Sequence, residues 1–145
     1  MRKALLILLI PLVLFAKDKT LLYKETIKGM DFEEVKLLLK SALDGKNMNV
    51  LAITDVSQKP RMTVFYVCNL SYGEKILRKL PEFGAMAPCR IYILEKPDGS
   101  VEIGYINIPG LVKTFRKYLG KEEREVFMQA DKDIKEAIKE IKEGK

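Results

Sequence analysis

The stretch MTVFYVCNLSYGEKILRKLPEFGAMAPCRIYILE, residues 62–95, decides the fold. It holds two short apolar runs, at 62–67 and 90–94, with a helical pattern between them. Short apolar runs bounded by turn residues are typical of strands buried on both faces, so we expect two such strands here. The only two cysteines of the chain close the first run and open the second, as Cys68 and Cys89. We therefore expect the functional site at these strand ends.

Turn and cap residues divide the rest of the chain into further elements. Asp31 can cap the start of a helix, and Glu34 lies three residues further on, at the spacing of a capping box. Asp98-Gly99 is a strong hairpin signal between two apolar runs. The pattern predicts strands at 21–28, 48–56, 62–68, 90–96 and 100–108. It predicts helices at 31–43, 71–80 and 122–142, and a short one at 111–119.

With the short helix left aside, the order of elements is β-α-β-β-α-β-β-α. This order favours an α+β fold, in which helices pack on one face of a mostly antiparallel sheet and a long helix closes the chain. The strand at 21–28 is expected at an edge of that sheet. No linker divides residues 17–145, so we predict a single α+β domain there.

Residues 1–16 have the pattern of a secretory signal peptide. Arg2 and Lys3 precede an apolar run at 4–15, and Ala16 precedes a polar segment. The run is too short for a helix that spans a bilayer, which needs about 20 residues. We expect cleavage after Ala16 and a soluble protein in the periplasm or outside the cell, with no membrane insertion afterwards. The other interpretation is an N-terminal helix that is buried in the core.

The composition limits the chemistry that the chain can perform. Hydrophobic residues make up 48% and charged residues 32% of the chain, as in a globular protein. The chain has no histidine, which excludes Ser-His-Asp and Cys-His catalysis and histidine-bound metals. No metal or cofactor motif is present, so none is predicted. Lys and Glu dominate the charged residues, a bias that favours a thermophilic source.

Other functional classes find no support in the charge pattern. The net charge is +6, but basic residues are interleaved with acidic ones, which disfavours nucleic-acid binding. Paired acids such as Glu33-Glu34 point in different directions on a helix, so no catalytic carboxylate pair is predicted. The polar side of the helix at 122–142 mixes both signs, as expected of a helix that packs on its own sheet or on a partner.

The order of an apolar strand, Cys68-Asn69, a helix, Pro88-Cys89, a strand, an Asp-Gly hairpin and a terminal helix resembles the domain of unknown function 302 family. The resemblance covers residues 23–141, essentially all of the chain after the leader. It implies an α+β fold similar to the TATA-binding-protein topology, and a homodimer. It implies no assigned activity, and the similarity of fold does not indicate DNA binding.

The two cysteines allow three interpretations. They can be small buried hydrophobic residues, or a disulfide, which an oxidising compartment permits. They can also be reactive thiols, sulfur carriers or soft-metal ligands, in which case Met86 is a possible thioether ligand near Cys89. Arg90 could lower the pKa of the adjacent thiol if its side chain turned towards the sulfur. The sequence does not decide between these interpretations.

Our leading hypothesis is an exported, dimeric, non-enzymatic module that binds a small ligand or a protein partner. The alternative is a thiol-dependent redox, sulfur-transfer or soft-metal protein that uses Cys68 or Cys89, with a redox protein as its partner. Both hypotheses place the site between the strand end at 68–69 and the apolar loop at 83–89. The candidate residues are Cys68, Asn69, Phe83, Met86, Pro88, Cys89 and Arg90.

Overall fold

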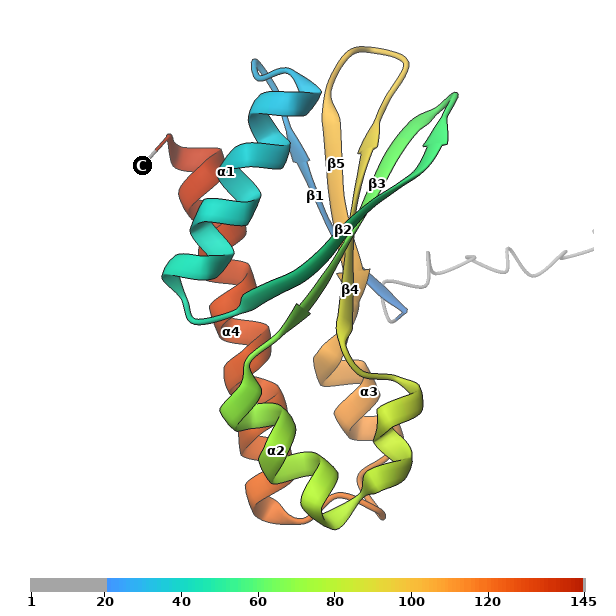
Figure 1. The fold of residues 1–145 in the computed structure, drawn as a ribbon, viewed down its shortest axis with the longest axis vertical. Coiled ribbons are helices and arrows are strands. Elements are labelled where there is room, and N and C mark those ends of the chain that lie inside the picture. The colour runs from blue at the N-terminus through green and yellow to red at the C-terminus, as the bar shows by residue number, and fades with distance from the viewer. Residues whose placement is uncertain (1–20, 145) are drawn as a thin grey trace, which may run out of the picture.

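The computed structural model describes residues 21–144, which fold around one sheet of five strands (Figure 1). The strands are β1 (Leu22–Ile27), β2 (Asn49–Gln58), β3 (Arg61–Cys68), β4 (Cys89–Glu95) and β5 (Val101–Ile106). They lie in the order β1-β5-β4-β3-β2, and each neighbouring pair is antiparallel. β1 and β2 therefore form the two edges of the sheet, and the predicted edge position of the first strand is confirmed.

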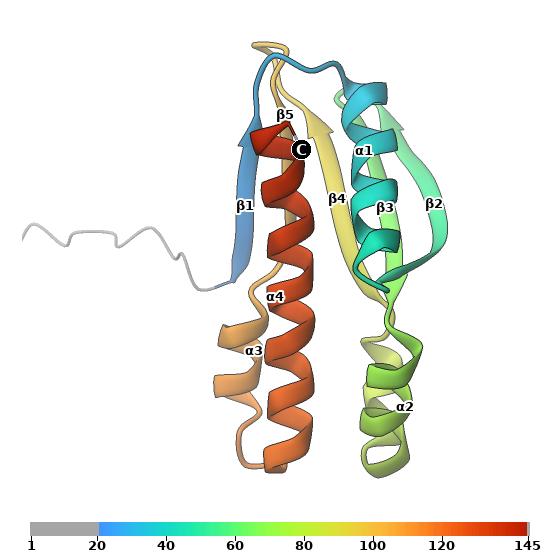
Figure 2. The ribbon, with the colours of Figure 1, turned by 90° about the vertical axis from the view of Figure 1, so that its left-hand side faces the viewer.

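Two helices cover one face of the sheet, as Figure 2 shows. They are α1 (Phe32–Gly45) and the long C-terminal helix α4 (Lys121–Glu143), which lie side by side. The helix α2 (Leu70–Lys79), the 3-10 helix η1 (Pro81–Ala85) and α3 (Ile108–Thr114) gather beyond one end of the sheet (Figure 1). Only α4 runs along both the sheet and this group of short helices. The predicted α+β class and the order of elements are confirmed.

The core lies between the sheet and these two helices. In β3 and β4, alternate side chains face the helices and are fully buried, namely Phe65, Val67, Ile91 and Ile93. The side chains between them point to the other face and are only partly buried, namely Val64, Tyr66, Tyr92 and Leu94. The expectation that both strands are buried on two faces is wrong, because the described helices cover only one face of the sheet.

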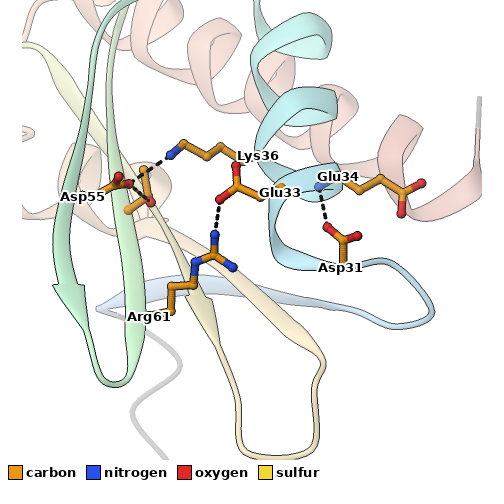
Figure 3. Close-up of polar contacts among 7 residues, drawn as sticks. Asp31, Glu33, Glu34, Lys36, Asp55 and Arg61 are labelled. Atoms are coloured by element: carbon orange, nitrogen blue, oxygen red, sulfur yellow. Dashed lines mark hydrogen bonds and ion pairs between the residues drawn. The ribbon is translucent and has the colours of Figure 1, made fainter.

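Both turn signals act as the sequence predicts. The hairpin between β4 and β5 turns at Gly99, which has a φ of 81° and donates its N–H to the carbonyl of Lys96 at 2.9 Å. A positive φ of this size is accessible to glycine at little cost. The carboxylate of Asp31 accepts the N–H of Glu34 at 2.8 Å and caps α1 (Figure 3). The cap satisfies one of the free donors at the start of the helix.

A polar cluster ties α1 to the β2–β3 hairpin (Figure 3). The buried hydroxyl of Thr63 donates to Asp55 at 2.5 Å, and Lys36 lies 3.0 Å from the same carboxylate. Arg61, from the start of β3, pairs with Glu33 on the helix. The bond from Thr63 and then that from Lys36 hold the pKa of Asp55 below its usual range. These contacts fix the helix over the sheet at the end opposite the short helices.

The predicted signal peptide at 1–16 lies outside the described residues and stays a prediction. None of the helices within residues 21–144 has the length and apolar composition needed to cross a membrane.

Candidate functional site

A largely apolar cavity of about 430 Å³ lies where the sheet meets the short helices. The ends of β3 and β4 form one wall, and α2 and η1 form a second. The N-terminal half of α4 and the start of α3 form further parts of the lining. Of its lining residues, Arg90 alone carries a charge. A volume of this size is typical of a small-molecule site.

Both cysteines line this cavity from neighbouring strands. Val67 pairs with Cys89 in the β3–β4 ladder, so Cys68 lies one residue beyond that pair. The structure contains both as free thiols. The sulfur of Cys68 packs against α2 so closely that a Cβ atom added to Gly73 would lie 3.1 Å from it. The fold thus brings the two sulfur-bearing strand ends together at one end of the sheet, a point that the sequence leaves open.

Neither thiol has the surroundings of a reactive thiolate. Burial raises the pKa of Cys68, whose Sγ donates weakly to the backbone carbonyl of Asn69 at 3.5 Å. Burial, with a smaller contribution from Cys68, raises the pKa of Cys89 as well. Reactive cysteines need a lowered pKa, since the thiolate is the nucleophile. The cationic Arg90 therefore does not activate the thiol beside it.

Asn69 has a structural role at the start of α2. Its side-chain oxygen accepts the N–H of Tyr72 at 3.1 Å and caps the helix. The chain can therefore turn from β3 directly into a helix that forms one wall of the cavity. The amide NH₂ group of Asn69 is not used in this cap, and the residue also lines the cavity.

The apolar segment 81–88 supplies a further part of the cavity lining. Phe83 packs with its ring centroid 5.4 Å from that of Phe127 on α4 and 5.9 Å from that of Phe115 after α3. Met86 and Pro88 continue the lining up to the start of β4. The sequence predicts a loop here, but the first part of the segment is the 3-10 helix η1, which begins at a proline.

A buried polar group borders the cavity near α4. The hydroxyl of Tyr105, on β5, donates to Asp131 at 2.9 Å, and Lys135 lies 2.6 Å from the other oxygen of that carboxylate. Burial and the negative charge of Asp131 raise the pKa of Tyr105. The ring centroid of Tyr23 lies 5.1 Å from that of Tyr105, with the two rings tilted. Burial and the negative charge of Glu25 raise the pKa of Tyr23 to about 12. The hydroxyl of Tyr105 is thus neutral and already paired.

All seven residues singled out from the sequence line this one cavity. Residue patterns alone do not reveal the residues that the cavity takes from distant parts of the chain, among them Met48, Tyr105, Phe127 and Ala130. Phe127 and Ala130 belong to the apolar stripe of α4, and nothing in that stripe distinguishes a cavity wall from a packed core. Asp131 is also buried, although an acidic residue of an amphipathic helix is expected to face solvent.

No metal centre is indicated in the described part of the chain, since no three His, Cys, Asp or Glu side chains gather there as metal ligands would. The two cysteines and Met86 share the cavity, and soft sulfur ligands of this kind suit Cu(I).

Comparisons with known proteins extend these observations. The model of the family described as "Domain of unknown function DUF302" matches residues 23–141. An uncharacterized protein of Aquifex aeolicus (strain VF5) is 75% identical over 144 residues, which cover 99% of this chain and 99% of that protein. The crystal structure of an uncharacterized conserved protein DUF302 from Bacillus stearothermophilus has the same fold, with a TM-score of 0.70 and 18% identity. The match covers 81% of this chain and 95% of that one.

Proposed function

Since this chain belongs to the DUF302 family, whose function is unknown, we propose a function from the geometry of the cavity: the protein is a binding module for a small, mainly apolar ligand. In this proposal the protein is not an enzyme. The ligand lies between the ends of β3 and β4 and the segment 81–88, and the residues around it position it without reacting with it.

The observation that carries the proposal is an apolar cavity of about 430 Å³ within a well-packed domain. Protein interiors are packed as densely as organic crystals, so natural cores contain few large voids. An unfilled cavity also costs stability, because its lining loses contacts. A cavity of this size that opens to the surface is therefore better explained by a ligand than by loose packing.

Calorimetric titration of the protein with 1-octanol, a neutral amphiphile, tests this proposal. We expect saturable binding to the wild type and a loss of binding of at least tenfold in Ala130→Leu, whose larger side chain would occupy the cavity. Gln129→Leu adds the same side chain to the exposed side of α4 and should bind as the wild type does. Equal binding by all three proteins, or none by the wild type, would refute the proposal.

The alternative function is thiol-dependent redox chemistry, sulfur transfer or soft-metal binding. Its support is that Cys68 and Cys89 line the same cavity and are free. The raised pKa of each thiol opposes a nucleophilic role. A buried neutral thiol behaves as a small hydrophobic residue, which suits the wall of an apolar site.

The proposal also includes export and self-association. The leader pattern at 1–16 supports export, and N-terminal sequencing of protein from the producing cell should begin at Lys17. Self-association is supported by the free edge of β2, where Leu51 and Val56 are about half exposed, and by Leu37 of α1, which is 69% exposed. Two such edges can pair about a two-fold axis. Light scattering should give the mass of a dimer, and a monomer at micromolar concentration would refute this part.

A further inference from the structure

We propose that the ligand carries one negatively charged head group, a carboxylate, which binds Arg90 at the rim of the cavity, with its apolar chain inside. This inference rests on the proposed function and adds the chemical class of the ligand: a medium-chain monocarboxylate.

The first support is the position of Arg90. It lines the cavity, it is exposed, and it lies at the start of β4 opposite Tyr66 in the ladder. Its guanidinium carbon lies 5.8 Å from the centre of the Tyr66 ring. No carboxylate of the described residues lies within ion-pair distance of it, whereas Arg61 and Arg78 each have one. A charged residue that lines an apolar cavity and has no carboxylate partner is suited to bind the opposite charge of a ligand.

The second support comes from the other polar groups of the lining. Three tyrosines belong to the lining, and the hydroxyl of each donates its hydrogen to a carboxylate of the protein. The pairs are Tyr72 with Asp133 at 3.1 Å, Tyr92 with Glu102 at 2.6 Å and Tyr105 with Asp131 at 2.9 Å. These hydroxyls have no hydrogen left to donate to an anion.

The same carboxylates decide how the ligand is oriented. Asp131 is buried and bonded to the lining residue Tyr105, and Lys135 already pairs with its other oxygen, so a negative charge placed beside it would lose its hydration without gaining the Tyr105 hydroxyl as a donor. The apolar rings of Phe83 and Phe127, which both line the cavity, favour a hydrocarbon chain beside them. In this orientation the charge lies with Arg90, which is exposed, so water still reaches it.

The presence of a single arginine in the lining indicates which kind of charged group the ligand carries. A guanidinium binds a carboxylate through two parallel N–H···O bonds. A phosphate at neutral pH carries more charge and usually takes several donors. Within the described residues Arg90 is the one cation of the lining, so a single carboxylate matches the site better.

A matched pair of ligands tests the inference. Decanoate and 1-decanol have chains of the same length and differ in the charged group. We expect the wild type to bind decanoate about tenfold more tightly than Arg90→Met does, as for the loss of a charge-assisted pair at a partly exposed site. Binding of 1-decanol should change less than twofold in the same variant. Arg116→Met removes an exposed arginine outside the cavity and should behave as the wild type towards both ligands.

The outcomes separate this inference from the proposed function. If Arg90→Met binds decanoate as tightly as the wild type, or if Arg116→Met loses the same affinity, the head-group inference is wrong. Binding of 1-decanol would still support the cavity in either case. If the wild type binds neither ligand, the proposed function itself is wrong. Arg90→Gln provides a second variant with a polar side chain should the methionine variant fail to fold, and the same tenfold loss is expected.

Discussion

The two ends of the sheet are lined by the same kinds of side chain, yet they are packed differently. At the end covered by α1, the core is filled by residues such as Phe32, Val35 and Ile138, each no more than 2% exposed. At the other end, the apolar residues of α2, η1 and α3 surround a cavity of about 430 Å³. Hydrophobic composition therefore does not distinguish a core from a binding site. A core and a binding site differ in whether the side chains of the surrounding elements are in contact or leave a space between them.

The helix α4 contributes residues both to the filled core and to the cavity wall, so equivalent positions at the two ends of the sheet can be compared on one helix. Ile134 and Ala137 face the filled end and are fully buried, whereas Ala130, two turns before Ala137, lines the cavity. The polar ties also differ: the cluster around Asp55 holds the filled end together (Figure 3). Substitutions of one kind at the two ends should thus have different effects, ordered below from the largest to the smallest.

Truncation of an isoleucine should cost most at the filled end. Ile134→Ala leaves a void in a closely packed core, and we expect it to lower the free energy of unfolding by about 2–5 kcal/mol. Ile76→Ala, on the cavity wall, removes a side chain that already borders empty space and should cost about half as much. Urea denaturation measures both. Equal losses would contradict the contrast between a filled and a hollow end.

Enlargement of an alanine should also cost more stability in the filled core than at the cavity wall. Ala137→Leu forces extra atoms into a filled core, and we expect a loss of about 1–3 kcal/mol. Ala130→Leu has the cavity to grow into and should change the free energy of unfolding by less than about 1 kcal/mol. The two alanines lie on the same side of one helix, so helix propensity cancels. A larger loss of unfolding free energy for Ala130→Leu than for Ala137→Leu would mean that no space exists beside Ala130.

The thiols at the hollow end should react slowly. Because burial raises the pKa of Cys68 and of Cys89, less thiolate is present at pH 7 than in an unperturbed cysteine. Alkylation of the native protein by iodoacetamide should be slower than that of free cysteine, and it should accelerate as the pH rises. Cys68→Ser and Cys89→Ser assign each rate to one thiol. A thiol that reacts faster than free cysteine at pH 7 would favour the redox or sulfur-transfer function instead.

Acid should weaken the filled end through Asp55. The pKa of Asp55 is lowered in the folded protein, so its ionised carboxylate stabilises the fold at pH values above 3.8, the pKa in the unfolded chain. This stabilisation is lost as the pH falls from there through the lower pKa of the folded protein. The melting temperature should therefore decrease below about pH 4. Asp55→Asn should show a shallower decrease, with only part of the slope removed, because other carboxylates also have a lowered pKa. An identical slope for the two proteins would exclude this role of Asp55.

Much of the fold could be predicted from local signals. The cap at Asp31, the turn at Asp98-Gly99 and the helical stripe of α4 each act within a few residues, so the sequence reveals them. The burial of β3 and β4 was predicted wrongly, since apolar runs do not show whether a second layer of helices exists. The structure provides one layer, and the other face stays partly exposed.

The candidate residues could be located in part for a related reason. Cys68-Asn69 and Pro88-Cys89 flank one helical segment between neighbouring strands, so their proximity follows from the order of elements. The cavity itself could not be predicted, because it depends on where α4 passes, more than thirty residues further along the chain. Phe127 and Ala130 fit a core stripe and a cavity wall equally well, and only the fold tells these apart.

Xenon binding in a pressurised crystal is the most direct test of the hollow end, since an apolar cavity takes up xenon without any specific polar contact. We expect xenon density beside Phe83, Phe127 and Cys89 in the wild type, and none there in Ala130→Leu. A wild-type crystal without xenon at this place, with the side chains of α2 and η1 packed against α4, would contradict the existence of the cavity.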